Sequence, residues 1–254
     1  MIKLEHVVLA SPEQMEFIIQ GMRNPHNSWD KSDSNDCNKR CIDCYLCPDT
    51  GDKDKDADLI VECYEKHHNK GFILGENDHS LMQRLANAGT DNRKFMRMMP
   101  VYVRITAPLY WWKEFDTYKV ATVANSCSTM HKIQEKEFTL EDFSTEHLFD
   151  CYGDPSMNLN YGYKYPKAVI YDLIDILNNY RVWYKETKDK KYWWQMIQLL
   201  PSSYNQTRNV MMNYEVLCNI YKSRKSHRLD EWVEFCKWIE ELPYSELIVG
   251  KEED

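Results

Sequence analysis

The sequence predicts a single mixed α+β domain that covers residues 1–254 and carries a polar insertion at about residues 24–58. Three observations support this fold class. Strand-like and helix-like segments occur along the same chain, no internal repeat or Gly/Ser linker divides it, and 43% apolar with 28% charged residues supply a full core.

The first element is a strand-like run over residues 2–9, followed directly by a helix start. Ser11 is a suitable N-cap and Pro12 fits the first turn, where a missing N–H costs nothing. The apolar residues between Met15 and Met22 then recur at helical spacing. We therefore expect a strand and an amphipathic helix before the insertion.

The insertion is rich in Asn, Asp, Ser, Lys and Gly, and its tail over residues 49–58 is a charge run typical of a solvated segment. Beyond it, alternation over residues 102–106 predicts a strand that Pro108 ends. Helical periodicity is found over residues 59–68, 81–88, 109–122, 167–184, 209–222 and 229–242.

The charge of the chain restricts its partners. Lys plus Arg number 32 against 40 Asp plus Glu, which argues against a broad surface for duplex nucleic acid but allows a local basic pocket for a small anion. No apolar run approaches the roughly 20 residues that cross a bilayer, and the first residues do not resemble a signal peptide. We expect a cytoplasmic protein without a membrane partner.

A cluster of four of the nine cysteines lies in the insertion, at Cys37, Cys41, Cys44 and Cys47. Thiolates at this density are able to hold a zinc ion or an iron–sulfur cluster, and in a reducing compartment free thiols or metal ligands are favoured over disulfides. The first three match the C-x3-C-x2-C spacing of radical-SAM enzymes, although the chain is short for their barrel. Unligated surface thiols remain the alternative.

Residues 102–131 form the most informative segment, because a strand runs into a proline-started helix crowded with aromatic residues and then into small polar residues. Small residues let a ligand approach the backbone and hydroxyl groups. Lys113 and Lys119 beside aromatic rings suit a phosphate and a stacked base, although a partly buried aromatic helix with snorkelling lysines gives the same pattern.

This segment resembles the signature of the flavin-dependent thymidylate synthases, in which an A/C-P-[IL]-[FY] turn leads into R-H-R-x-x-S-x-N-E-x-S-x-R-Y. The matched positions are Ala107-Pro108-Leu109-Tyr110 for the turn, Thr117-Tyr118-Lys119 for R-H-R, Thr122 for the first serine, and Asn125 and Ser128 for the asparagine and second serine with one inserted residue. Without the insertion, Cys127 takes the second serine position.

A second match lies downstream, where Leu200-Pro201, Thr207, Asn213, Leu217 and Arg224 echo the family pattern L-P…T…N-x-R-x-L…R. Glu215 stands where the family carries an arginine. The resemblance covers roughly residues 1–22 and 70–245.

The resemblance implies a flavin-dependent thymidylate synthase-like fold, with a central mixed sheet and flanking helices, and a homotetramer. It also implies methylation of dUMP, or a related reaction on a pyrimidine nucleotide, with FAD as cofactor and NADPH and methylene-tetrahydrofolate as co-substrates. Carried over residue by residue, it assigns Ser128 to catalysis by hydrogen bonding to substrate. It assigns Lys119, Arg208, Asn213 and Arg224 to the substrate, and Lys113, Tyr118 and Asn125 to the cofactor.

Most of the family's arginines are replaced in this chain, and lysine does not reproduce bidentate binding of phosphate. Arg93, Arg97 and Arg104 are further cations near the matched segments. Three hypotheses follow: an enzyme acting on a pyrimidine nucleotide, a non-catalytic homologue that binds a nucleotide or a protein partner, and a metalloprotein whose chemistry lies at the cysteines. Ser128 also has a plain structural interpretation, as a serine that caps its own backbone.

Overall fold

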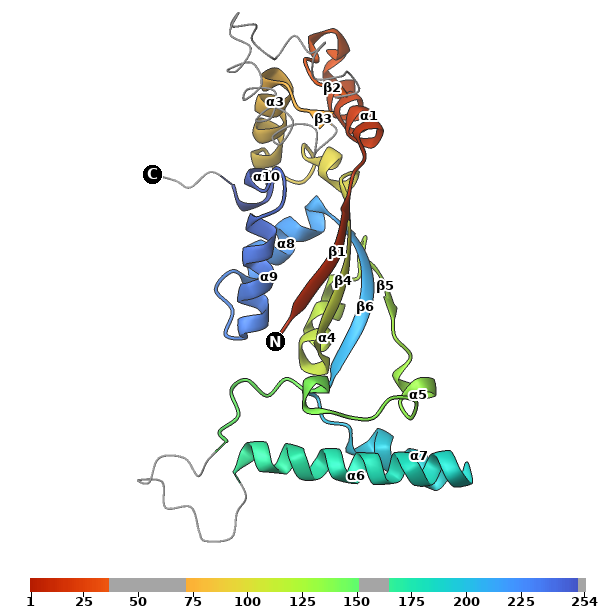
Figure 1. Ribbon diagram of the computed structural model, residues 1–254. Helices are drawn as coiled ribbons and strands as arrows, with labels where there is room; N and C mark the ends of the chain where they lie inside the picture. The colour runs from red at the N-terminus through yellow and green to blue at the C-terminus, as the bar shows by residue number, and fades with distance from the viewer. Residues whose placement is uncertain (37–71, 151–164, 251–254) are drawn as a thin grey trace, which may run out of the picture.

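A four-stranded antiparallel sheet runs along the length of the molecule (Figure 1). In spatial order its strands are β1 (Lys3–Leu9), β4 (Pro100–Pro108), β6 (Asn205–Asn213) and β5 (Val123–Ser126). The computed structural model describes residues 1–36, 72–150 and 165–250. The cysteine cluster and the expected helix over residues 59–68 lie outside these ranges.

One face of the sheet is covered by helices and the other is open. On β4, alternate side chains such as Val101 and Ile105 are buried, whereas Tyr102 between them is 46% exposed. The buried face packs against α4 (Leu109–Phe115), α8 (Tyr214–Arg224) and α9 (Asp230–Glu240) in one hydrophobic cluster. Period-two alternation thus sorts the residues of β4 between core and solvent.

Two helices begin where a strand ends. Pro108 is the N-cap of α4, and the backbone N–H of Leu109 donates to the carbonyl of Tyr204 across 3.0 Å. Asn213 ends β6 and caps α8, with its Oδ1 accepting from Val216 N at 3.0 Å. The carbonyl of Tyr204 and the side chain of Asn213 each satisfy an N–H group that a helix start leaves without an intrahelical partner.

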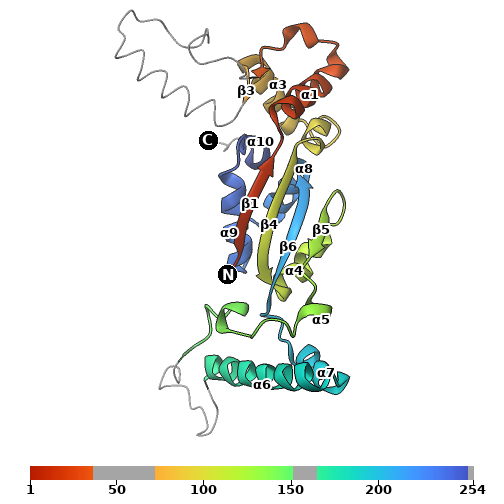
Figure 2. The same cartoon turned by 45° about the vertical axis from the view of Figure 1, so that its right-hand side comes forward.

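The end of the molecule near α1 contains a second, two-stranded sheet (Figures 1 and 2). Ser11 caps α1, as the sequence predicts, and the structure adds a capping box with Gln14. The elements here are α1 (Pro12–Arg23), η1 (Asn24–His26), η2 (Trp29–Lys31), β2 (Asn35–Asp36), β3 (Phe72–Ile73), α3 (Glu76–Asn87), η5 (Lys94–Arg97) and α10 (Glu246–Val249).

At the opposite end, a helical hairpin lies across the end of the sheet (Figure 2). Its helices α6 (Pro166–Thr187) and α7 (Lys190–Leu199) bury a smaller hydrophobic cluster that includes Phe138, Leu177 and Met196. Three further short elements lie in the described ranges: η6 (Asp116–Tyr118), α5 (Thr129–Lys132) and η7 (Leu140–Asp142). No helix in the described ranges is long and apolar enough to span a bilayer.

Three expectations about the fold are wrong. All the ladders are antiparallel, so the sheet is not mixed. The helix expected over residues 109–122 ends at Phe115, because the chain tightens into η6 and turns at Ala121, with φ of 61°, into β5. Residues 209–213 belong to β6 rather than to the following helix, because they pair with β4 and β5.

Candidate functional site

A cavity of about 430 Å³ lies where β6 begins, beside α5 and the segment that leads to η7. Its lining includes the predicted residue Ser128 and two rings, Phe138 and Tyr204, whose centroids are 6.4 Å apart. The lysines Lys132 and Lys136 also face it. The volume lies within the range of small-molecule pockets, and the lining combines hydroxyls and rings with two lysines and two carboxylates, Glu137 and Asp142.

The hairpin supports the walls of this cavity. The side-chain amide of Asn178 on α6 exchanges two hydrogen bonds of 2.9 Å with the backbone of Phe138. Trp193 on α7 donates through Nε1 to the carbonyl of Met130 on α5 at 3.0 Å. Helices that sequence reasoning did not connect with the site therefore hold two of its walls.

Ser128 is exposed and caps α5, with its Oγ accepting from the backbone N–H of His131 at 3.3 Å. Within the described part of the chain its hydroxyl has no side-chain base as a partner, so nothing there activates it as a nucleophile. Its orientation toward the cavity is compatible with hydrogen bonding to a ligand. The catalytic assignment stays a prediction.

A chain of hydrogen bonds links the cavity to Arg208. Gln206 donates through Nε2 to Thr129 Oγ1 at 2.9 Å and accepts at Oε1 from Arg208 Nε, also at 2.9 Å. Arg208 itself pairs with Asp116 at 3.0 Å, and its guanidinium carbon lies 4.2 Å from the centroid of Trp112. Arg208 therefore orients a residue of the cavity wall, while its own charge is already balanced.

Arg224 is held in the same manner on the far side of α4. Its Nη1 donates to Glu114 at 2.7 Å, its Nε donates to the hydroxyl of Tyr118 at 2.9 Å, and its guanidinium carbon lies 4.7 Å from the ring of Trp232. This engages both Arg224, predicted for substrate, and Tyr118, predicted for cofactor. Asn213, the third predicted substrate residue, is buried as the cap of α8.

The other predicted residues do not converge on the cavity. Lys113 and Lys119 are exposed on α4 and just after η6. Asn125 lies on β5 opposite Asn209 and lines a separate hollow of about 310 Å³ over the open face of the sheet. Among the described residues of one copy, the predicted cofactor residues therefore do not surround one cavity.

Glu215, which stands where the family carries an arginine, has a structural role in this chain. Arg93 pairs with Glu215 through Nε at 2.7 Å and through Nη2 at 3.1 Å, and Glu215 is buried. The two other arginines near the matched segments also bind groups of the protein itself. Arg97 donates to the carbonyl of Thr90, and Arg104 donates to Asn209 Oδ1. Nothing in these contacts leaves Arg93 available to a ligand.

The metal hypothesis gains no support in the described ranges, where no group of three His, Cys, Asp or Glu residues could hold an ion. Of the cysteines described there, Cys127 is exposed in the cavity wall, while Cys218 and Cys236 are buried. Burial raises the pKa of Cys236 to about 11, so this thiol is unreactive. Metal binding at Cys37, Cys41, Cys44 and Cys47 stays a prediction outside the described residues.

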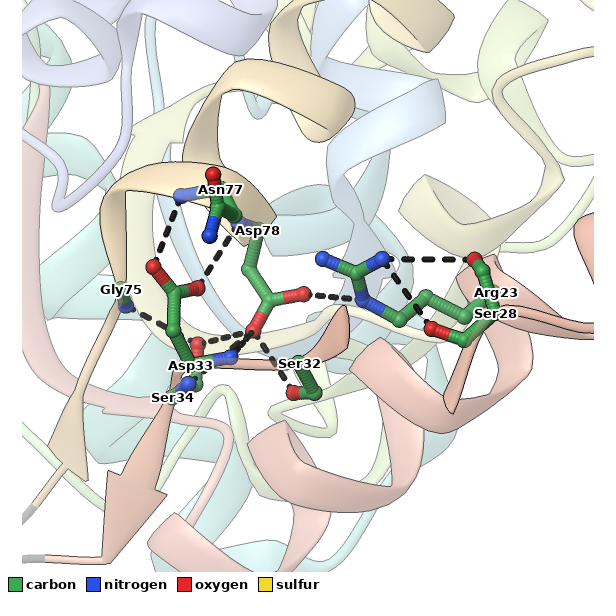
Figure 3. A network of polar contacts seen from close by, with 8 residues as sticks. All are labelled: Arg23, Ser28, Ser32, Asp33, Ser34, Gly75, Asn77 and Asp78. Carbon is green, nitrogen blue, oxygen red and sulfur yellow. Dashed lines mark hydrogen bonds and ion pairs between the residues drawn. The ribbon is translucent and has the colours of Figure 1, made fainter. Parts of the chain in front are cut away.

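A network around Asp78 is a polar centre that sequence reasoning missed (Figure 3). The fully buried carboxylate accepts from Arg23, from the hydroxyls of Ser32 and Ser34 and from two backbone N–H groups. Burial alone would raise the pKa of Asp78, but the hydrogen bonds outweigh it and hold the pKa below its usual value. The network joins the segment after α1 to the start of α3.

No protein-family model matches the sequence, and no curated protein matches it significantly. The structure is similar to two crystal structures of flavin-dependent thymidylate synthase ThyX from Helicobacter pylori with FAD and dUMP. Each has a TM-score of 0.56 and covers 97% of this chain, with 14% and 15% identity over 95% and 94% of the ThyX chains.

A UMP/dUMP methylase, PolB from Streptomyces cacaoi bound with 5-Br UMP, matches over 65% of this chain and 76% of its own, with 14% identity and a TM-score of 0.42 that is too low to support an argument. At these levels of identity the ThyX likeness establishes architecture and nothing finer: this chain has the fold of the flavin-dependent thymidylate synthases.

Proposed function

We propose that this protein binds a pyrimidine nucleotide in the cavity beside α5 and acts on it with FAD, by dUMP methylation or a related reaction. The observation that carries the proposal is the coincidence of a cavity of about 430 Å³, lined by Ser128, with a fold whose neighbours are crystallised with FAD and dUMP. NADPH and methylene-tetrahydrofolate belong to this proposal as co-substrates.

The lining suits the parts of a nucleoside monophosphate. The partly buried Tyr204 offers aromatic surface for a planar base, with the buried ring of Phe138 packed against it. Burial, followed by the charge of Asp142, raises the pKa of Tyr204, so its hydroxyl stays protonated. Lys132 and Lys136 offer charge for a phosphate. Their pairs with Glu135 and Asp142 involve lysines that are 64% and 73% exposed, and such surface pairs are weak and easily exchanged.

The flavin does not fit one copy of the chain. Lys113, Tyr118 and Asn125 are dispersed, and the Tyr118 hydroxyl is taken by Arg224. A flavin site built from these residues would require surfaces of more than one copy, as in a homo-oligomer. The tetramer implied by the resemblance is therefore part of the proposal.

A seam on α6 supports self-association. Val169, Ile176 and Trp183 are 52%, 41% and 46% exposed, and with the partly buried Leu173 and Tyr180 they follow the alternating spacing of four and three residues found in coiled coils. If two α6 helices pair antiparallel, Trp183 faces Val169 of the second copy. Large side chains then meet small ones, which a parallel pair would not achieve.

The second candidate function is a non-catalytic homologue that binds a nucleotide or a protein partner. The pairs Arg208–Asp116 and Arg224–Glu114 favour it, because they neutralise two cations predicted to hold substrate. A site with its guanidinium groups engaged binds a phosphate less strongly than a site in which they are free.

The absorption spectrum of protein purified without added flavin, together with complementation of a thymidine-requiring bacterium, separates the two functions. The enzymatic function predicts that the purified protein carries a flavin chromophore, or acquires one when FAD is added. It also predicts that the complemented bacterium grows without thymidine. A colourless protein that FAD does not stabilise against thermal unfolding, and that fails to complement, would exclude the enzymatic function.

Serine substitutions at Cys37, Cys41, Cys44 and Cys47 test the metal hypothesis. Of the three hypotheses, only this one predicts that these substitutions abolish activity.

A further inference from the structure

A groove of about 780 Å³ lies between α3 and the segment from Arg23 to Lys31. These elements lie at the opposite end of the sheet from α5 and the nucleotide cavity (Figure 1). At about 30 Å³ for each water molecule, this is the volume of roughly 25 waters, which far exceeds that of a single ion. The groove shares no lining residue with the nucleotide cavity.

The groove is strongly basic in a protein of net charge −8. Its cationic or protonatable side chains are Arg23, His26, Lys31 and Arg84, and no carboxylate of the described chain lines it. Arg23 is balanced by Asp78, so it contributes little net charge. Lys31 and Arg84 are exposed and have no ion pair or hydrogen bond with any described residue, so both cations are unpaired within the described part of the chain.

The walls of the groove are fixed by the Asp78 network (Figure 3). Arg23 is 4% exposed and donates through Nη1 to the carbonyl and hydroxyl of Ser28 at 3.2 and 3.3 Å, which ties the segment after α1 to the end of that helix. Asp33 accepts from the backbone N–H groups of Asn77 and Asp78 at 2.9 and 3.1 Å, which holds the start of α3. Lys31 and Arg84 therefore project from elements joined by buried hydrogen bonds.

The remaining lining specifies the kind of ligand. Asn77 and Ser80 on α3 offer neutral donors, while Leu81 and Leu85 on the same helix and its C-cap residue Ala88 form an apolar strip. A guanidinium binds phosphate oxygens with two parallel hydrogen bonds, and a lysine adds a point charge. We infer that this groove binds a ligand that carries two or more phosphate groups, with Arg84 and Lys31 as its main contacts.

The test uses sodium tripolyphosphate as the probe, titrated calorimetrically into the full chain at low ionic strength. The inference predicts saturable binding that weakens at least tenfold in Arg84→Glu and in Lys31→Glu and that falls as salt is added. Lys185→Glu, an exposed residue of α6 at the other end of the molecule, makes the same change in net charge and is expected to bind like the wild type.

Absence of binding, equal affinity in Arg84→Glu and wild type, or an equal loss in Lys185→Glu would each overturn the inference. Lys31 and Arg84 are exposed, so their substitution is expected to leave the fold intact. Unchanged thermal unfolding of the variants checks that they are folded. Titration of dUMP into the same variants distinguishes the two sites. Failure of dUMP binding would leave the tripolyphosphate result for the groove intact, and failure of tripolyphosphate binding would leave the dUMP result intact.

Discussion

Arg224 and Glu114 lie 110 residues apart in the sequence, yet the guanidinium of Arg224 donates to the carboxylate of Glu114 across 2.7 Å. The same carboxylate oxygen accepts from Trp232 Nε1 at 2.9 Å. A cation that the resemblance assigns to substrate binding therefore joins α4, α8 and α9 within the chain.

Replacing Glu114 with Gln is expected to lower the free energy of unfolding by about 1–3 kcal/mol, because the partly buried Arg224 loses its counter-charge. Urea unfolding provides the measurement. Glu135→Gln is the matched control, because its partner Lys132 is exposed and the pair is expected to contribute less than about 1 kcal/mol. Equal destabilisation by the two substitutions would contradict the structural role given to Arg224.

A double-mutant cycle with Arg208→Met and Asp116→Asn is expected to give a coupling energy of about 0.5–3 kcal/mol, because the two side chains are in direct contact at 3.0 Å. Methionine removes the charge together with the bond to Gln206 and the stacking on Trp112. The free energies of unfolding of four proteins complete the cycle. Strict additivity would show that the pair is not formed in solution.

Asp78→Asn is expected to cost about 3–5 kcal/mol, since it leaves the buried Arg23 without a counter-charge. Glu13→Gln, at an exposed position in the first turn of α1, is the comparison and is expected to cost well under half as much. Chemical unfolding of both variants measures the difference. A small effect at Asp78 would mean that the network does not hold α1 and α3 together.

The stability difference between wild type and Asp78→Asn is expected to depend on pH. The pKa of Asp78 is lowered on folding, so its contribution is complete above the unfolded pKa and is lost as the pH falls through the folded one. The difference in unfolding free energy between wild type and Asp78→Asn is therefore expected to be constant near pH 6 and to shrink below about pH 4. A difference that grows on acidification would have the wrong sign.

Local signals in the sequence predicted several elements correctly. The Ser11 cap, the strand ended by Pro108 and the helices near residues 167–184 and 229–242 all depend on neighbours along the chain. The α+β fold class followed from these elements.

Two regions of the fold were mispredicted because a nonlocal partner decided them. Residues 210–213 satisfy a helical stripe as well as a strand, and only pairing with β4 and β5 selects the strand. Asn213 followed by Glu215 in the first turn of α8 was the available signal for the true helix start. Likewise, β5 is a strand because it finds β6 more than 80 residues later in the chain.

The candidate site was predicted least completely. Ser128 does line a cavity, but no local pattern indicates that Arg208 pairs with Asp116 or that Arg224 pairs with Glu114, because each pair joins residues more than 90 positions apart. Lys132 and Lys136 were passed over: Lys132 is the last residue of α5, and Lys136 lies four residues later in the turn that follows the helix.

The α6 seam predicts that Ile176→Glu reduces the mass of the protein in solution, because a buried carboxylate would lie at the centre of the antiparallel pair. Light scattering coupled to gel filtration measures that mass. Tyr171→Glu is the control, since Tyr171 is 47% exposed on the opposite side of the helix and is expected to leave the assembly unchanged. A wild-type monomer would remove the proposed assembly.

Ser128→Ala is expected to weaken dUMP binding about two- to tenfold, the value of one neutral hydrogen bond, with little loss of stability because α5 is a single turn. Ser126→Ala, two residues earlier on β5, removes a hydroxyl that does not line the cavity. Calorimetric titration of both variants separates ligand binding from capping. Equal affinity in the two would mean that Ser128 only caps its own helix.

Calorimetric titration of dUMP into the wild type and Lys136→Glu tests the nucleotide cavity most directly. We predict saturable binding by the wild type that weakens at least tenfold in Lys136→Glu, while Lys185→Glu, with the same change of charge at an exposed residue that does not line the cavity, binds normally. Absence of binding, or the same affinity in Lys136→Glu as in the wild type, would contradict the proposed site.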